Sequence, residues 1–287
     1  MSSASASGDM PSARDFGWRL REKSASHFDI SQRDNGQFTV VLNHPLLRSV
    51  SAEMLSWWFR TFTTLRVTLE DVPGYVGERV PGYMLWHPVD HLSATLIGRT
   101  SADGSPLPGR TQIHIREAMQ YGVFGQRFPV DAKLTVYYAG PDGWAMGKRL
   151  PLLGPAMMLR IHFRNVFDEG KRVGVHYHYE VVIGVSGRDP ISRLINRRLT
   201  AAYGPDFFAA WQTHNVEEVG TFENFLAPLF AQAERGEPLR FSRRMDAAPP
   251  DALDSGYDEA LFQRRVETLK GAGDPYAVQA YDQGSFL

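Results

Sequence analysis

Alternation of apolar and polar residues predicts several strands in the middle of the chain. A short strand is expected at Gln37 to Asn43 (QFTVVLN), where β-branched residues alternate. Longer strands are expected at 109–119, 128–139, 158–167 and 172–185. Turn sequences such as ADG at 102–104 and GPDG at 140–143 separate them. Long strands with few crossovers indicate an α+β fold.

Helical periodicity begins after Ser51, which is a plausible N-cap with Glu53 in the first turn. The broad apolar face of this helix consists of Met54, Leu55, Trp58 and Phe62. Trp57 and Trp58 are adjacent, so apolar groups point in more than one direction. Either the helix packs wholly on its own core, or one face meets a second subunit. We expect a homodimer.

Two further helices are predicted near the end, at 191–202 and 205–230, the second being rich in Phe, Trp and Leu. Beyond Arg235 the composition shifts to Asp, Pro, Gly and Arg. We interpret this region as a tail on the surface, with one short helix at 258–269.

Composition excludes several classes of function. The 287 residues include no cysteine, which excludes disulfides, thiol nucleophiles and Cys-based zinc sites. Lys plus Arg (31) nearly balance Asp plus Glu (32), so no nucleic-acid partner is expected. The apolar run at 150–158 is short and broken by prolines, and the Ser-rich N-terminus lacks a secretory apolar stretch. We therefore expect a cytoplasmic protein without a membrane partner.

The strongest chemical feature is the pair His214 and Glu218 in the last long helix. Residues four apart lie one turn apart on one helix face and can bind the same metal ion. The alternative is an exposed helix pair that arose by chance. The surrounding helix is largely apolar, however, and polar groups there need a partner.

A second cluster, His87, Asp90 and His91, lies in the segment WHPVDH. One imidazole could bind a metal while the carboxylate orients an imidazole through its other ring nitrogen. The alternative is a polar turn after Pro88. The spacing leaves open whether His87 or His91 is the ligand.

The strand QIHIRE at 112–117 supplies a carboxylate. With period two, Glu117 shares a face with Ile113 and Ile115, whereas His114 lies on the other face. A carboxylate on an apolar face is costly unless it is paired or bound to metal. Glu117 is therefore the better ligand candidate, and His114 is expected at the surface.

Two other strands carry His162 and the run His176 to Tyr179 (HYHY). Tyr177 and Tyr179 share one face. A phenol and an imidazole that point into a binding site can hold a hydroxylated ring or transfer a proton. The alternative for each is an ordinary core or surface position.

Three segments taken together resemble the 2,4-diacetylphloroglucinol hydrolase family, which includes phloretin hydrolase. They are HPLLRSVSAEMLSWWF (44–59), YMLWHPVDH (83–91) and HNVEEVGTFENFLAPLF (214–230). The resemblance implies an α+β, Bet v 1-like helix-grip domain, with a curved antiparallel sheet around a long C-terminal helix. It implies a helical dimerisation segment, placed at 16–74, before the catalytic domain at 75–235. The Ser-rich composition of 1–15 predicts a disordered leader, and the composition of 236–287 predicts the surface tail.

The resemblance also implies a Zn²⁺ ion bound by two histidines and two glutamates. On matching positions these are His91, Glu117, His214 and Glu218. His162 resembles the catalytic histidine, and Tyr83 and Tyr177 resemble the tyrosines that hold the phenolic ring. The implied reaction is hydrolysis of the carbon–carbon bond between an acyl group and a polyhydroxylated aromatic ring, with a small aromatic ketone as substrate.

Two other functions compete with this hydrolase. One is a metal-free carrier of an apolar or aromatic ligand, because fold does not fix function. The other keeps the metal but changes the reaction, to ester hydrolysis or to a polyketide cyclase step.

Overall fold

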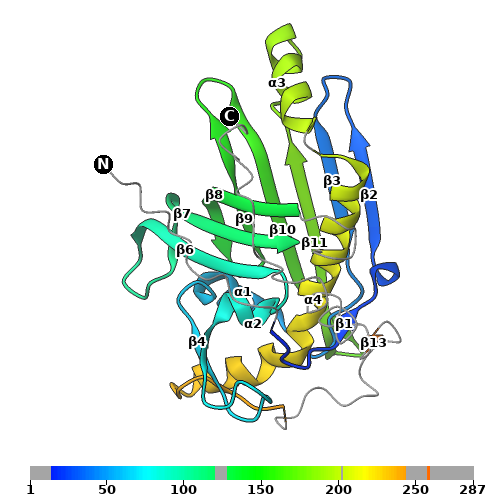
Figure 1. The fold of residues 1–287 in the computed structure, drawn as a ribbon. Coiled ribbons are helices and arrows are strands. Elements are labelled where there is room, and N and C mark those ends of the chain that lie inside the picture. The colour runs from blue at the N-terminus through cyan, green and yellow to red at the C-terminus, as the bar shows by residue number, and fades with distance from the viewer. Residues whose placement is uncertain (1–13, 120–127, 202, 244–256, 259–287) are drawn as a thin grey trace.

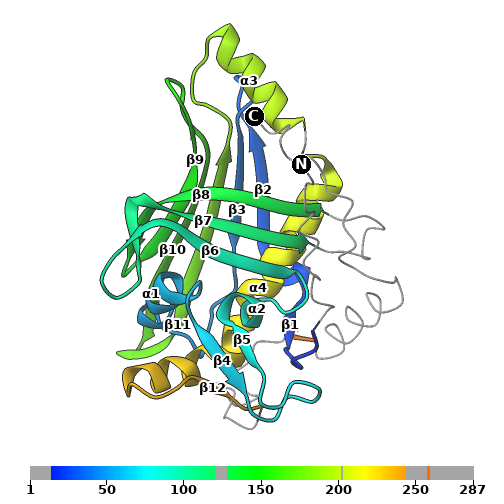
Figure 2. The same ribbon diagram turned by 60° about the vertical axis from the view of Figure 1, so that its left-hand side comes forward.

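A computed structural model describes residues 14–119, 128–201, 203–243 and 257–258, which contain a large antiparallel sheet (Figures 1 and 2). Its eight strands pair in the order β2-β3-β11-β10-β9-β8-β7-β6. They are β2 (His27–Gln32), β3 (Phe38–Asn43), β6 (His91–Thr100), β7 (Pro106–Met119), β8 (Phe128–Gly140), β9 (Gly143–Leu150), β10 (Gly154–Asp168) and β11 (Lys171–Ile183).

The remaining elements are helices and two small sheets. The helices are η1 (Lys23–Ala25), α1 (Ala52–Thr61), α2 (Gly82–Trp86), α3 (Pro190–Thr200) and α4 (Pro205–Glu234). One small sheet contains β12 (Arg240–Phe241), β4 (Arg66–Leu69) and β5 (Arg79–Pro81); the other pairs β1 (Leu20–Arg21) with β13 (Tyr257–Asp258).

The long strands bury every second side chain, as apolar alternation in the sequence predicts. In β11, Tyr177, Tyr179 and Val181 are buried on one face, while the residues between them are partly exposed. The five predicted strands correspond to β3, β7, β8, β10 and β11, so these elements are confirmed.

Helix α1 begins as predicted, because the Ser51 side chain accepts a hydrogen bond from the Met54 amide. Trp58 is fully buried and packs against the rings of Phe222 and Phe225 in α4. Trp57 contacts Phe230, also in α4. Both tryptophans therefore have partners within the chain, and the homodimer stays a prediction.

Helix α4 packs against the sheet through aromatic rings. Phe208 contacts Phe38 of β3, and Trp211 contacts Tyr179 of β11. These contacts hold α4 in place beside the sheet (Figure 1). One side of α4 thus faces the strands along its first half.

The predicted fold class is wrong. The described residues are mostly a large antiparallel sheet of eight strands with few helices, with 27% of them helical and 44% in strands, and not a sheet wrapped around a long C-terminal helix. The sequence pattern missed β2, β6 and β9. In β2 no residue is buried, so apolar alternation is weak there. Helix α4, moreover, is followed by β12.

The predicted domain boundaries stay predictions. Most of the leader at 1–15, most of the tail at 236–287 and nearly all of the short helix at 258–269 lie outside the described residues. Within the described residues, no helix combines the length and the apolar character that crossing a membrane requires.

Candidate metal centre

Three elements bring four metal-ligating side chains together. His91 is the first residue of β6, and it pairs with Glu117 of β7 in the strand register. His214 and Glu218 lie one turn apart on α4, which contacts β7. These are the four predicted ligands, and the structure places them in one cluster, called here the four-ligand cluster.

The distances within this cluster suit a metal ion. His91 Nε2 lies 3.7 Å from Glu117 Oε1 and 3.5 Å from Glu218 Oε2. His214 Nε2 lies 3.8 Å from Glu117 Oε2 and 3.9 Å from Glu218 Oε2. A tetrahedral ion with ligands at about 2.0 to 2.2 Å separates ligand atoms by roughly 3.3 to 3.6 Å. These four histidine–carboxylate separations are close to those that one ion needs, and His91, Glu117 and His214 each offer a ligand atom within 4.8 Å of the other two.

His91 presents a lone pair to this cluster. Its Nδ1 lies 2.9 Å from the Tyr83 carbonyl oxygen, which can only accept, so Nδ1 carries the proton. Nε2 is then the unprotonated nitrogen, and it is buried without a hydrogen-bond partner. Burial, with His214 and His87 nearby, holds the pKa of His91 well below its usual value. A buried lone pair that lacks a donor is what a metal ligand requires.

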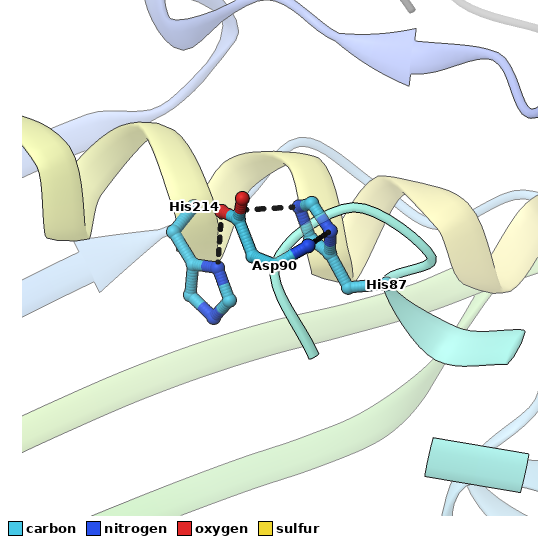
Figure 3. A group of neighbouring side chains, drawn as sticks. All are labelled: His87, Asp90 and His214. Carbon is cyan, nitrogen blue, oxygen red and sulfur yellow. Dashed lines mark hydrogen bonds and ion pairs between the residues drawn. The ribbon is translucent and has the colours of Figure 1, made fainter. Parts of the chain in front are cut away.

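His87 has a different environment (Figure 3). Its Nδ1 accepts a hydrogen bond from the Asp90 amide at 3.1 Å, and its Nε2 lies 3.2 Å from Glu217 Oε2. His87, Asp90 and His214 form a second buried group whose ligand atoms lie within 4.8 Å of one another and could hold a metal ion. Both ring nitrogens of His87 already have partners, so His91 is the better ligand.

Asp90 links this second group to the four-ligand cluster. Its Oδ2 lies 3.0 Å from Nδ1 of His214, and the carboxylate lies between the rings of His87 and His214 (Figure 3). This contact leaves Nε2 of His214 directed at Glu117 and Glu218. A carboxylate that orients a histidine in this way is typical of metal sites.

The charges in the cluster favour a cation. Burial lowers the pKa of His214, but the hydrogen bond to Asp90 and the charges of Glu117 and Glu218 outweigh it and raise the pKa to about 9. Burial raises the pKa of Glu218 to about 8 against the opposing effect of His214. Protons therefore compensate the buried carboxylates when no other cation is bound, and a metal ion can replace them.

One tyrosine contacts the cluster, and two more lie near enough for the charge of Glu218 to affect them. The Tyr83 hydroxyl donates a hydrogen bond to Glu117 Oε1, and its ring stacks on His91 with centroids 4.0 Å apart. Tyr177 and Tyr179 are buried. Burial first, and then the charge of Glu218, raises the pKa of both phenols well above the usual value. The phenols therefore stay protonated at neutral pH.

The structure does not bring His162 to the cluster. Ile161 and Phe163 face the core, while His162 is exposed on the other side of β10. Its ring neighbour is His178, with centroids 6.4 Å apart. The catalytic role that the resemblance implied for His162 therefore has no support from its position.

Sequence reasoning missed Asn215 beside the cluster. Asn215 donates a hydrogen bond from Nδ2 to Glu218 Oε1 at 2.6 Å, and its Oδ1 lies 3.0 Å from His44 Nε2. Asn215 directly follows His214 in the sequence, and this position could have marked it as a neighbour of the ligands. Tyr179 was placed on the same strand face as Tyr177 from the sequence, but only Tyr177 was expected to hold the ring.

No model of a known protein family matches the chain, and no curated protein matches it.

Proposed function

We propose that this protein is a zinc-dependent hydrolase that cleaves the carbon–carbon bond between an acyl group and a polyhydroxylated aromatic ring. The four-ligand cluster of His91, Glu117, His214 and Glu218 carries this proposal. The set of two imidazoles and two carboxylates agrees with the ligands that the family resemblance implies.

The donor atoms favour zinc over the hard cations. Magnesium and calcium prefer sites made of oxygen atoms, whereas imidazole nitrogen suits zinc and its neighbours in the first transition row. Two of the four donors are imidazole nitrogens. Zinc in such a site supplies Lewis acidity, which polarises a carbonyl group and makes a water molecule more acidic.

The ligands are held by neighbouring side chains. Tyr83 donates a hydrogen bond to Glu117, Asp90 faces His214, and Asn215 donates to Glu218. A ligand that is fixed by a second contact keeps its orientation when substrate binds. The chain therefore provides a rigid site rather than four mobile ligands.

The phenols support an aromatic, hydroxylated substrate. Tyr83, Tyr177 and Tyr179 are protonated at neutral pH, and a neutral phenol can both donate and accept a hydrogen bond. A ring with several hydroxyl groups offers the matching partners. The ring hydroxyl beside the acyl group has a further role, because it permits the keto tautomer whose ring carbon can leave.

The overall reaction balances with one water molecule. The acyl carbon gains the water oxygen as a carboxylic acid, the bond to the ring breaks, and the ring carbon gains a proton. Tyr177 and Tyr179 are buried groups that hold a proton beside the cluster. We assign them to the substrate ring in place of His162.

The experiment that tests this function is incubation of the zinc-loaded protein with a monoacylphloroglucinol in ¹⁸O-labelled water. We expect a carboxylic acid that carries one ¹⁸O atom, together with the free phloroglucinol ring. The matched control is the same ketone with its ortho hydroxyl groups methylated, which should not react. Ready hydrolysis of aryl esters without acid release from any 2-hydroxyaryl ketone contradicts the proposal.

A further inference from the structure

A chain of hydrogen bonds leads from His44 to the four-ligand cluster. His44 follows β3, and its ring Nε2 lies 3.0 Å from Oδ1 of Asn215. Nδ2 of Asn215 donates to Oε1 of Glu218 at 2.6 Å. The other oxygen, Oε2, lies 3.5 Å from His91 Nε2. In this chain of bonds, His44 reaches the ligand Glu218 only through Asn215.

The direction of each bond follows from chemistry. A carboxylate oxygen accepts, so the amide nitrogen of Asn215 faces Glu218 and its carbonyl oxygen faces His44. That oxygen also accepts, so Nε2 of His44 must carry the ring proton. Nδ1 is then unprotonated, and it is buried with no hydrogen-bond partner.

The surroundings keep His44 neutral and in place. Burial lowers its pKa to about 3, against the opposing effect of the bond to Asn215, so the ring holds one proton at neutral pH. The His44 amide donates to the Tyr177 carbonyl oxygen at 3.3 Å, and the two rings meet edge to face. The side chain is thus fixed to β11 at a residue next to the cluster.

We propose that His44 is a positioning residue of the metal centre. It fixes Asn215, which occupies one oxygen of Glu218 and leaves the other oxygen for the ion. Glu218 would then bind through a single oxygen. This inference rests on the metal centre of the proposed function, and it adds a residue outside the ligand set that controls how tightly the ion is held.

Two substitutions at one position separate the hydrogen bond from packing. His44→Gln keeps an amide N–H near the place of Nε2, whereas His44→Phe keeps a ring and removes the donor. We expect His44→Phe to weaken zinc binding by up to about 10-fold, the lower end of the usual cost of losing a direct outer contact of a ligand, because His44 acts on Glu218 through Asn215. His44→Gln should stay close to wild type.

Zinc affinity is measured by competition with a chromophoric chelator, and the visible spectrum of the cobalt-substituted protein reports the ligand geometry. The matched control is His178→Phe, which removes a similar bond, from His178 Nδ1 to Asn43 Oδ1 at 2.7 Å. This bond has no connection to Glu218 among the contacts of the described residues. The control should leave affinity and spectrum unchanged.

A second measurement needs no variant and no metal. Long-range ¹H–¹⁵N correlation spectra of the metal-free wild-type protein report which nitrogen of His44 is protonated. We expect the Nε2–H tautomer, and the Nδ1–H tautomer overturns the proposal even if His44→Phe does not fold.

The outcomes separate the two proposals. Unchanged zinc affinity in a folded His44→Phe variant overturns the role of His44 and leaves the proposed function standing. A wild-type protein that binds no zinc overturns both. Weakened zinc binding in His44→Phe, in a protein that releases no acid from any acylated ring, supports the role of His44 and overturns only the hydrolase.

Discussion

Oδ2 of Asp90 lies 3.0 Å from Nδ1 of His214, and both side chains are almost completely buried. The carboxylate accepts a hydrogen bond from Nδ1–H of His214 and so directs Nε2 at the cluster, which also makes Nε2 a stronger ligand. Asp90→Asn should therefore weaken zinc binding by about 10- to 100-fold, as chelator competition can measure. The control is Asp131→Asn, which alters a similar but more exposed contact, 2.7 Å from His114, and should have no effect. Equal affinity in Asp90→Asn and wild type contradicts this role.

Removal of zinc should destabilise the protein. An ion that binds only the folded state at a concentration of 100 times its dissociation constant adds about 2.7 kcal/mol to the free energy of unfolding. In a chain of this size this corresponds to roughly 5 to 10 °C in the melting temperature. We expect this rise on zinc addition and its reversal by a chelator. Glu218→Gln keeps the side-chain volume but loses the charged ligand, so an equal rise in that variant contradicts its role as a ligand.

The buried, neutral His44 should make the metal-free protein sensitive to acid. Burial lowers its pKa from the ordinary 6.5 to about 3 in the folded state. As the pH falls below 6.5, the unfolded chain takes up the proton first. The stability that neutral His44 contributes is therefore present above pH 6.5 and is lost as the pH falls towards about 3.

Urea unfolding between pH 6.5 and pH 4.5, with chelator present, measures this effect. One such proton changes the free energy of unfolding by up to about 1.4 kcal/mol per pH unit. His44→Gln removes the titrating group, so its stability should fall less steeply than that of wild type. Identical slopes show that His44 takes up its proton equally in both states.

Tyr177 and His162 should differ in their effect on catalysis. Tyr177→Phe deletes only a buried phenol, so we expect kcat/KM to fall by about 2- to 13-fold, equivalent to one hydrogen bond of 0.5 to 1.5 kcal/mol, with normal zinc content. His162→Ala should be close to wild type, because His162 is exposed on the other side of β10. A general acid or base contributes about 100- to 10,000-fold, so a loss of that size in His162→Ala restores it to the mechanism.

The contrast between Glu117 and His162 shows what the sequence could predict about the site. Both residues lie in predicted strands, where alternation of apolar and polar residues indicates which face a side chain occupies. Glu117 shares its face with Ile113 and Ile115, and that face is buried, so local periodicity placed it correctly. His162 alternates with Ile161 and Phe163, and the same logic places it outside. The family resemblance favoured His162 against the period-two pattern, and the pattern described the structure better.

Other parts of the fold and site depend on contacts between distant segments. His91 lies beside Glu117 because of the register in which β6 pairs with β7. Neither strand has a local sequence feature that predicts this register. Asp90 was expected to orient a histidine, yet its partner His214 lies far away in the chain. Strand β2 pairs with β3 but has no buried residue. Its sequence therefore lacks the apolar alternation from which a strand is predicted.

The measurement that tests the metal centre most directly is anomalous diffraction at the zinc edge from a crystal of the zinc-loaded protein. We expect one strong peak at about 2.0 to 2.2 Å from a nitrogen of His91, a nitrogen of His214 and an oxygen of each of Glu117 and Glu218. A peak held instead by His87, Asp90 and His214, or no peak within reach of the four ligands, contradicts this assignment.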